Sequence, residues 1–147
     1  MSNHWEKKLY ENFEIKASLK SLDGEFDLNF LAHSNDGKYV MKVMRIGCHA
    51  DLINMQCAAI RLLEGKNLCT PEIIPSNSGA DFASINDEKG NLRLVWVIKA
   101  KSGICYSGVE PRSEDFINDL GSKIGEIDNA LKQFDHPAGF SIPVETD

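Results

Sequence analysis

A tight turn at Asn35-Asp36-Gly37, set between two stretches of alternating hydrophobicity, is the feature that most constrains this chain. An Asp-Gly pair tolerates the positive φ angles of a short hairpin connection. The pattern therefore predicts an antiparallel hairpin made of strands 26–34 and 39–44. Any fold for the chain must accommodate this pair of strands near its centre.

Alternation in the second strand places Lys42 on one face, between Val40 and Met44. The next pattern predicts a helix from Ala50 to Glu64, with Gln56 on its apolar face. That face is formed by Leu52, Ala59 and Leu63. The helix should end around Gly65, a residue suited to a left-handed C-cap. We expect Lys42 and Gln56 to face inward together, an arrangement that suits a lysine reaching for phosphate oxygens. The alternative is a lysine that extends into solvent from an exposed strand face.

The segment before the hairpin predicts a helix and a strand. Residues 4–13 are amphipathic, and the side chains able to share one face are Trp5, Leu9 and Tyr10. Residues 14–21 predict a first strand with Ile15, Ala17 and Leu19 on one side. The loop at 22–27 contains Gly24, which fits either a simple turn or a loop that covers a bound nucleotide.

Residues 81–86 and 91–99 predict two further strands around a turn at 87–90. The second of these strands is the most apolar run of the chain, so we expect it at the centre of the sheet. A short extended piece at 70–75 is bounded by prolines, which predicts an edge position.

A linker without strong periodicity covers residues 99–111. Ser113 then begins a long helix, with Glu114 and Asp115 in its first turn, and Pro137 ends it. Apolar residues recur along this helix at steps of three and four. They are Phe116, Leu120, Ile124, Ile127, Leu131 and Phe134. The order of elements indicates an α+β fold with an antiparallel five-stranded sheet and one packed helix, followed by a linker and a long helix.

Composition excludes several classes of protein. The net charge of −6 argues against broad nucleic-acid binding, although it leaves room for a single nucleotide. No run of eighteen apolar residues is present, so we expect no membrane span, and the first residues lack the apolar core of a signal peptide. We therefore expect a cytoplasmic location. The four cysteines and four histidines lack metal-ligand spacing, so we expect neither a zinc site nor a disulfide framework.

Six motifs occur in order with consistent gaps, at residues 22–30, 36–43, 51–56, 121–128, 130–131 and 134–137. Together they resemble the small N-terminal lobe of the aminoglycoside phosphotransferase-like, protein-kinase-like superfamily. Within it the sequence is most similar to hydroxylysine kinase and to the kinase domain fused to class III aminotransferases. The resemblance implies a kinase-like small lobe at 1–98, a hinge at 99–112, and a connecting helix at 113–147 that begins an absent large lobe.

The resemblance also implies roles for individual residues. Lys42 would hold the α- and β-phosphates of ATP or GTP, and Gln56 would be its partner on the helix. Residues 24–30 would cover the phosphates, with Gly24, Glu25 and Asn29 as nucleotide-binding residues. The hinge that meets the adenine would be Ile98, Lys99 and Ala100.

The sequence departs from the family pattern in two ways. Many relatives have a glutamate where Gln56 stands, and glutamine can accept a hydrogen bond from Lys42 but cannot neutralise it. The hydroxylysine-kinase branch shares this glutamine. The His-Gly-Asp motif, the later asparagine and the magnesium-binding aspartate of the family do not occur here. We expect no catalytic or metal-binding residue in this chain, and Mg²⁺ only where a large lobe is present.

Two interpretations follow. The first is the nucleotide-binding half of a small-molecule kinase that phosphorylates a hydroxyl, with a hydroxylysine-like amino alcohol as substrate, and that is inactive alone. The second is a non-catalytic interaction module that uses the apolar face of helix 113–134 for self-association or for binding another chain.

Overall fold

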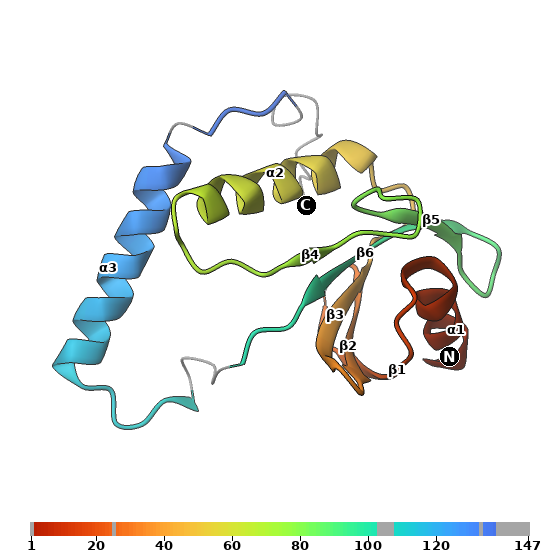
Figure 1. Cartoon of the computed structure of the whole chain (residues 1–147), viewed down its shortest axis with the longest axis horizontal. Helices are drawn as coiled ribbons and strands as arrows, with labels where there is room; N and C mark the ends of the chain where they lie inside the picture. The colour runs from red at the N-terminus through yellow and green to blue at the C-terminus, as the bar shows by residue number, and fades with distance from the viewer. Residues whose placement is uncertain (1, 25, 103–107, 133, 138–147) are drawn as a thin grey trace.

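The computed structural model describes residues 2–24, 26–102, 108–132 and 134–137. The fold is α+β, as the sequence predicts (Figure 1). Its elements in chain order are α1 (Ser2–Phe13), β1 (Ala17–Leu22), β2 (Leu28–Ser34), β3 (Gly37–Val43), α2 (Ala50–Gly65), β4 (Ile73–Ile74), β5 (Ala83–Asn86), β6 (Leu92–Lys99) and α3 (Glu114–Leu131).

The described strands form one antiparallel sheet of six strands in the order β1-β2-β3-β6-β4, with β5 also paired to β6. The predicted count of five is one too few, because the two-residue strand β4 joins the sheet beside β5. Both pair with the same edge of β6, β5 along residues 92–95 and β4 along residues 97–98. The apolar strand β6 therefore lies inside the sheet, and β4 lies at an edge, as predicted.

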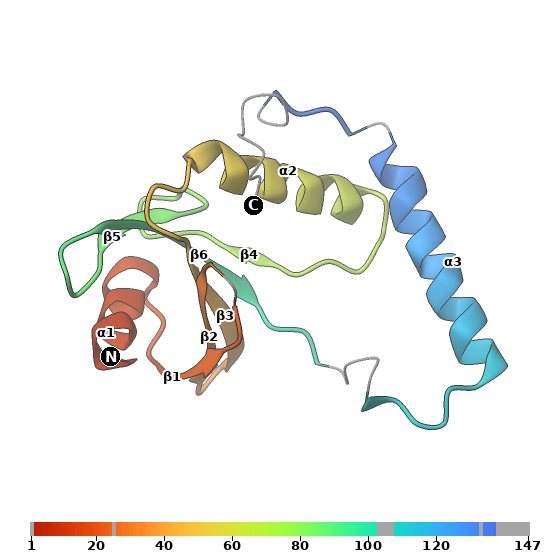
Figure 2. The same cartoon turned by 180° about the vertical axis from the view of Figure 1, so that it is seen from behind.

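Helices α1 and α2 cover opposite faces of this sheet (Figures 1 and 2). Alternation along β3 turns Tyr39, Met41 and Val43 toward the α1 side, where they are buried with α1 in one apolar cluster. Met44 and Trp96 belong to a second cluster on the α2 side. Val40, Lys42 and Met44 therefore share a face of the sheet with α2, as their alternation predicts.

Helix α1 buries residues at steps of four. Trp5, Leu9 and Phe13 are buried, whereas Tyr10 is 58% exposed. The predicted face with Tyr10 is wrong, because the contact with the sheet continues to the last turn of the helix. Glu14 then adopts φ 57°, and its N–H donates to the Tyr10 carbonyl at 3.0 Å. This ending of the helix explains why β1 begins at Ala17 and not at residue 14.

Helix α2 meets the sheet through Ile53 and Cys57, which are both fully buried. The predicted face of Leu52, Ala59 and Leu63 is only partly buried. The helix is apolar over more than half its circumference, so the sequence did not single out the side that the sheet covers. The left-handed residue after the helix is Asn67, at φ 60°, and not Gly65 as predicted, since the chain continues for two residues before it reverses.

Both predicted hairpin turns are confirmed. Asn35 and Asp36 join β2 to β3 with Ser34 opposite Gly37, and β2 begins at Leu28, two residues later than predicted. In the β5–β6 turn, Asp87 Oδ1 accepts hydrogen bonds from two backbone N–H groups. These turns fix the register of the sheet and hence the rows of side chains across it.

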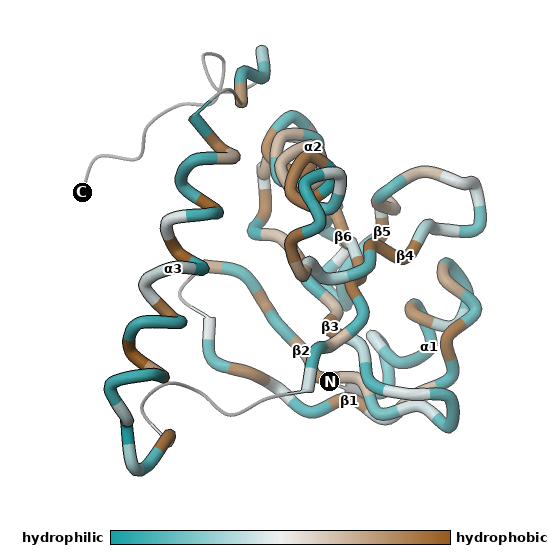
Figure 3. Tube along the Cα trace, turned by 60° about the vertical axis from the view of Figure 1, so that its left-hand side comes forward, coloured by the Kyte–Doolittle hydropathy of each residue, from teal (hydrophilic) through white to brown (hydrophobic). Residues whose placement is uncertain are grey.

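Helix α3 stands beside α2 and away from the sheet (Figures 1 and 2). Ser113 caps it, because its side chain accepts a hydrogen bond from the Phe116 N–H at 3.1 Å. Apolar and polar residues alternate along the helix (Figure 3), yet none of its described residues is buried. Ile117 and Ile124 are about half exposed. In the described part of the chain, no helix is long and apolar enough to cross a bilayer.

Candidate nucleotide site

Lys42 lies in the middle of a row of side chains that crosses three strands. The register places Asn29 of β2 on one side of it and Trp96 of β6 on the other. The next row on the same face is Leu31, Val40 and Ile98. The sheet therefore presents a polar row and an apolar row side by side, on the face that α2 only partly covers.

Among the described residues, the group beside the Lys42 ammonium is an aromatic ring and not a carboxylate. Its Nζ lies 5.8 Å from the centroid of the Trp96 ring, and Lys42 is half-buried. Gln56 is half-buried on α2, but no hydrogen bond joins it to Lys42 within the described ranges. The structure thus places Lys42 on the α2 side of the sheet without the contact to Gln56 that the sequence predicts.

Two buried polar atoms in this row lack a hydrogen-bond partner in the described structure: Asn29 Oδ1 and Trp96 Nε1. Buried polar groups are nearly always paired, because leaving one unpaired costs about 1–3 kcal/mol. They flank Lys42 from both neighbouring strands. The Lys42 ammonium and the Trp96 N–H are donors, which suit an anionic group, whereas Asn29 Oδ1 is an acceptor and would need a donor such as an amino or hydroxyl group.

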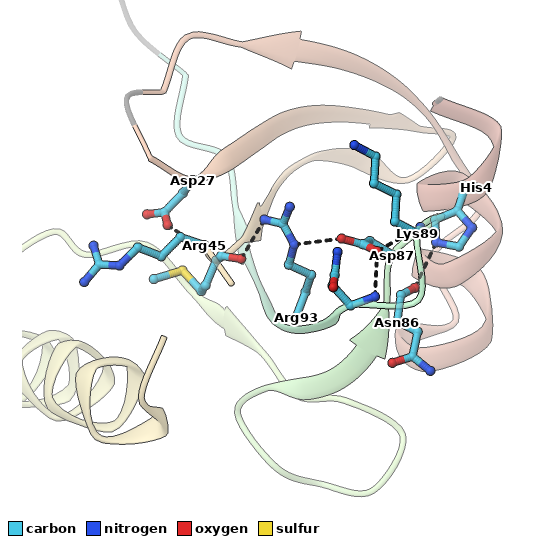
Figure 4. Close-up of polar contacts among 9 residues, drawn as sticks. His4, Asp27, Arg45, Asn86, Asp87, Lys89 and Arg93 are labelled. Atoms are coloured by element: carbon cyan, nitrogen blue, oxygen red, sulfur yellow. Dashed lines mark hydrogen bonds and ion pairs between the residues drawn. The ribbon is translucent and has the colours of Figure 1, made fainter. Parts of the chain in front are cut away.

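The turn before β2 approaches the polar row closely. A Cβ on Gly24 would lie 2.5 Å from the Asp27 carbonyl oxygen and 2.7 Å from Asn29 Nδ2. The Asp27 carboxylate accepts a hydrogen bond from the Arg45 N–H at 2.8 Å, as Figure 4 shows. Gly24 and Asn29 therefore lie close together; that this turn covers a nucleotide stays a prediction. Glu25 falls outside the described residues.

The predicted hinge lies at the end of β6. Ile98 is half-buried on the α2 side, while the N–H groups of Lys99 and Ala100 donate to the carbonyls of Glu72 and Lys38, at 2.8 and 2.9 Å. These two residues can therefore offer carbonyl oxygens but not N–H groups. An open cavity of about 570 Å³ adjoins them, lined by Leu31, Gly37, Lys38, Lys99, Ala100, Lys101 and Ser102.

Arg93 is a structural residue near the site that the sequence reasoning missed. Its guanidinium pairs with the Asp87 carboxylate at 3.1 Å and donates to the Met44 carbonyl at 3.1 Å (Figure 4). Burial acts to raise the pKa of Asp87, but hydrogen bonds from the Asn91 backbone and from Arg93 outweigh it and lower that pKa. The sequence signal for this residue was an arginine within an otherwise apolar strand. Through its two contacts, Arg93 links the β5–β6 turn to Met44, directly after β3.

The described residues include no group of three or more side chains able to hold a metal ion. The thiols of Cys48, Cys57 and Cys69 are free, and burial raises the pKa of Cys57 to about 11. Cys57 is accordingly a protonated, apolar side chain at neutral pH.

The fold of this chain is similar to that of one part of three solved kinase and phosphotransferase structures. No protein-family model matches the sequence, and no curated protein matches it either. The likeness is to solved structures at low sequence identity, so it concerns the fold.

Three such structures are small-molecule kinases. A microcompartment-associated aminopropanol kinase aligns over 94% of this chain and 43% of its own, with a TM-score of 0.69 and 17% identity. Amicoumacin kinase, solved with AMP-PNP and Ca²⁺, aligns over 92% and 41%, with a TM-score of 0.71 and 17% identity. Spectinomycin phosphotransferase, solved with ADP and spectinomycin, aligns over 92% and 41%, with a TM-score of 0.67 and 13% identity. The chain spans about two-fifths of the length of each.

Proposed function

We propose that this chain is the nucleotide-binding lobe of a small-molecule kinase that transfers a phosphoryl group from ATP or GTP to a hydroxyl. The observation that carries the proposal is the row of Asn29, Lys42 and Trp96, in which two buried polar atoms beside the lysine have no hydrogen-bond partner among the described residues. Kinases of this fold need a cationic group on this strand, because catalysis depends on positioning and on charge stabilisation.

The same face offers groups for each part of a nucleotide. Lys42 would contact the phosphates, and Asn29 and the Gly24 turn would lie over them. The apolar row of Leu31, Val40 and Ile98 provides a surface for a purine ring. The carbonyl oxygens of Lys99 and Ala100 would accept from an exocyclic amino group, since the N–H groups of both residues already donate within the chain.

The proposed reaction breaks the bond between the γ-phosphorus and the β,γ-bridging oxygen and forms a bond from that phosphorus to the acceptor oxygen. The acceptor proton passes to a base, and the products are a phosphate ester and ADP or GDP. The resemblance assigns that base and the Mg²⁺ ligands to a large lobe, so we propose that the 147 residues alone do not catalyse transfer. A hydroxylysine-like amino alcohol is our proposed acceptor, and the similarity to an aminopropanol kinase supports this class.

The test is equilibrium binding of ATP and GTP by calorimetry to the wild-type chain and to Lys42→Met. Loss of the ammonium removes a charge-assisted interaction worth about 1.5–3 kcal/mol, so affinity should fall roughly 10- to 150-fold. Lys89→Met is the matched control, because Lys89 is an exposed lysine of the β5–β6 turn and is not a member of the row. If Lys42→Met binds as tightly as the wild type, or if the wild type binds neither nucleotide, the proposal fails.

A second candidate function is an interaction module, favoured by the exposed isoleucines of α3. Ile117 and Ile124 are 50% and 51% exposed, an apolar surface of the kind that marks interfaces. Sedimentation of the wild type and of Ile117→Lys/Ile124→Lys tests it. Self-association that the double variant abolishes supports this function, and a wild-type monomer that binds no hydrophobic dye contradicts it.

A further inference from the structure

Lys42 faces an aromatic ring where many kinases of this fold offer it a carboxylate. Within the described ranges it has no ion pair, and Gln56, at the position of the usual glutamate, does not contact it through a hydrogen bond. Its Nζ instead lies 5.8 Å from the Trp96 ring centroid, within the distance at which a cation is attracted to an indole face.

Trp96 is well placed to hold the ammonium in one position. Its side chain is only 3% exposed and is packed with Met44, Ile53 and Cys57, so the ring has little freedom. The register fixes Trp96 directly across from Lys42 on the neighbouring strand. The long, flexible side chain of Lys42 thereby has a fixed surface to lie on, and it has no acidic partner among the described residues.

We propose that Trp96 is a positioning residue of the nucleotide site: its ring holds the Lys42 ammonium for the phosphates, in place of a carboxylate from α2. This inference rests on the proposed function and adds a residue to it. A ring attracts the ammonium without neutralising it, so the full positive charge of Lys42 remains available to a phosphate. A carboxylate partner would compete with the phosphate for that charge.

The indole N–H supports a role at the site. Trp96 Nε1 is buried and has no hydrogen-bond partner in the described structure, an uncommon state for a buried tryptophan. A tryptophan that served only to fill the core would be expected to have its N–H paired. The resonance of this N–H is also a local reporter for Lys42 and for ligand.

The experiment measures ADP affinity for the wild type, Trp96→Phe, Lys42→Met and the double variant. Phenylalanine keeps an aromatic core side chain but attracts a cation less, so Trp96→Phe should weaken ADP binding about two- to tenfold. In the Lys42→Met background the same change should have no further effect, because there is no ammonium left to position. Trp5→Phe is the matched control, since Trp5 is equally buried but lies on the α1 side of the sheet.

The ligand-free readout is the indole N–H spectrum of the ¹⁵N-labelled chain, which has two tryptophans. Lys42→Met should shift the Trp96 signal and leave the Trp5 signal in place. Trp96→Phe binding ADP as the wild type does, or equal losses in both lysine backgrounds, overturns the positioning role while the proposed function stands. A wild type that binds no ADP overturns both the positioning role and the proposed function, and so does a Lys42→Met chain that binds ADP as tightly as the wild type.

Discussion

Gly24 is the position where a single methyl group should disturb both the fold and the proposed site. Replacing it with alanine places a Cβ 2.5 Å from the Asp27 carbonyl oxygen and 2.7 Å from Asn29 Nδ2. The asparagine tip can turn aside, but the carbonyl belongs to the backbone of a turn that is fastened at Asp27 to the Arg45 N–H. The turn must therefore move by about 0.9 Å to bring the 2.5 Å approach to an ordinary contact distance of 3.4 Å.

The size of the effect follows from two opposed contributions. Overpacking of this kind lowers the free energy of unfolding by about 1–3 kcal/mol. Replacing glycine also restricts the unfolded chain, which raises the free energy of unfolding by about 0.4–1 kcal/mol. Gly24 does not have a positive φ angle, so no further backbone strain is added. The net expectation for Gly24→Ala is a loss of about 1–2 kcal/mol in the free energy of unfolding, together with weaker ADP binding through the displaced Asn29.

Urea denaturation followed by circular dichroism measures the first quantity, and calorimetry with ADP measures the second. Gly121→Ala is the matched control, because Gly121 lies inside α3 with no neighbour within 4 Å of an added Cβ. That change should raise stability by about 0.5–1 kcal/mol through helix propensity. A Gly24→Ala chain as stable as the wild type would refute the tight contact between the turn and β2.

Three further predictions concern the packing, the long helix and the response to acid. Ile53→Ala should cost about 2–5 kcal/mol in urea denaturation, and Leu52→Ala clearly less, because Ile53 is fully buried and Leu52 only partly; equal costs would contradict the face assigned to α2. Ser113→Ala should remove about 1 kcal/mol and lower helix content by circular dichroism, whereas Ser113→Asp should retain it. A hydrogen bond from Arg61 lowers the pKa of Asp81 in the folded protein. The pair therefore stabilises the fold at pH values above the ordinary carboxyl pKa. This contribution is lost as the pH falls through the lowered pKa of the folded state. Asp81→Asn should accordingly lose less stability on acidification than the wild type, and parallel pH curves for the two proteins would contradict this assignment.

Local signals were enough to predict much of the fold. The Asp-Gly turn and the alternation around Lys42 depend on neighbours in sequence, and both are confirmed. The Ser113 cap is confirmed for the same reason, because a cap is decided by the three residues that follow it. The apolar run of β6 correctly predicted a central strand, since a strand that is covered on both faces is apolar at successive positions.

Features that depend on distant contacts were not predicted. Which side of α2 is buried depends on where the sheet lies. The sequence pattern favoured the face of Leu52, Ala59 and Leu63, whereas the sheet covers Ile53 and Cys57. Trp96 is one apolar residue among several in its strand, and only the register brings it across from Lys42, more than fifty residues earlier. The turn at Asn67 was assigned to Gly65 because glycine is the commoner left-handed residue.

The most direct test of the account is an ADP titration of the ¹⁵N-labelled chain, followed by its amide spectrum. Binding across the polar row predicts that the largest shifts fall on Asn29, Lys42 and the end of β6, on the face shared with α2. The amides of α1, on the opposite face, should stay in place. Shifts centred on α1 or α3, or an unchanged spectrum at saturating ADP, would contradict the claim that this face of the sheet binds a nucleotide.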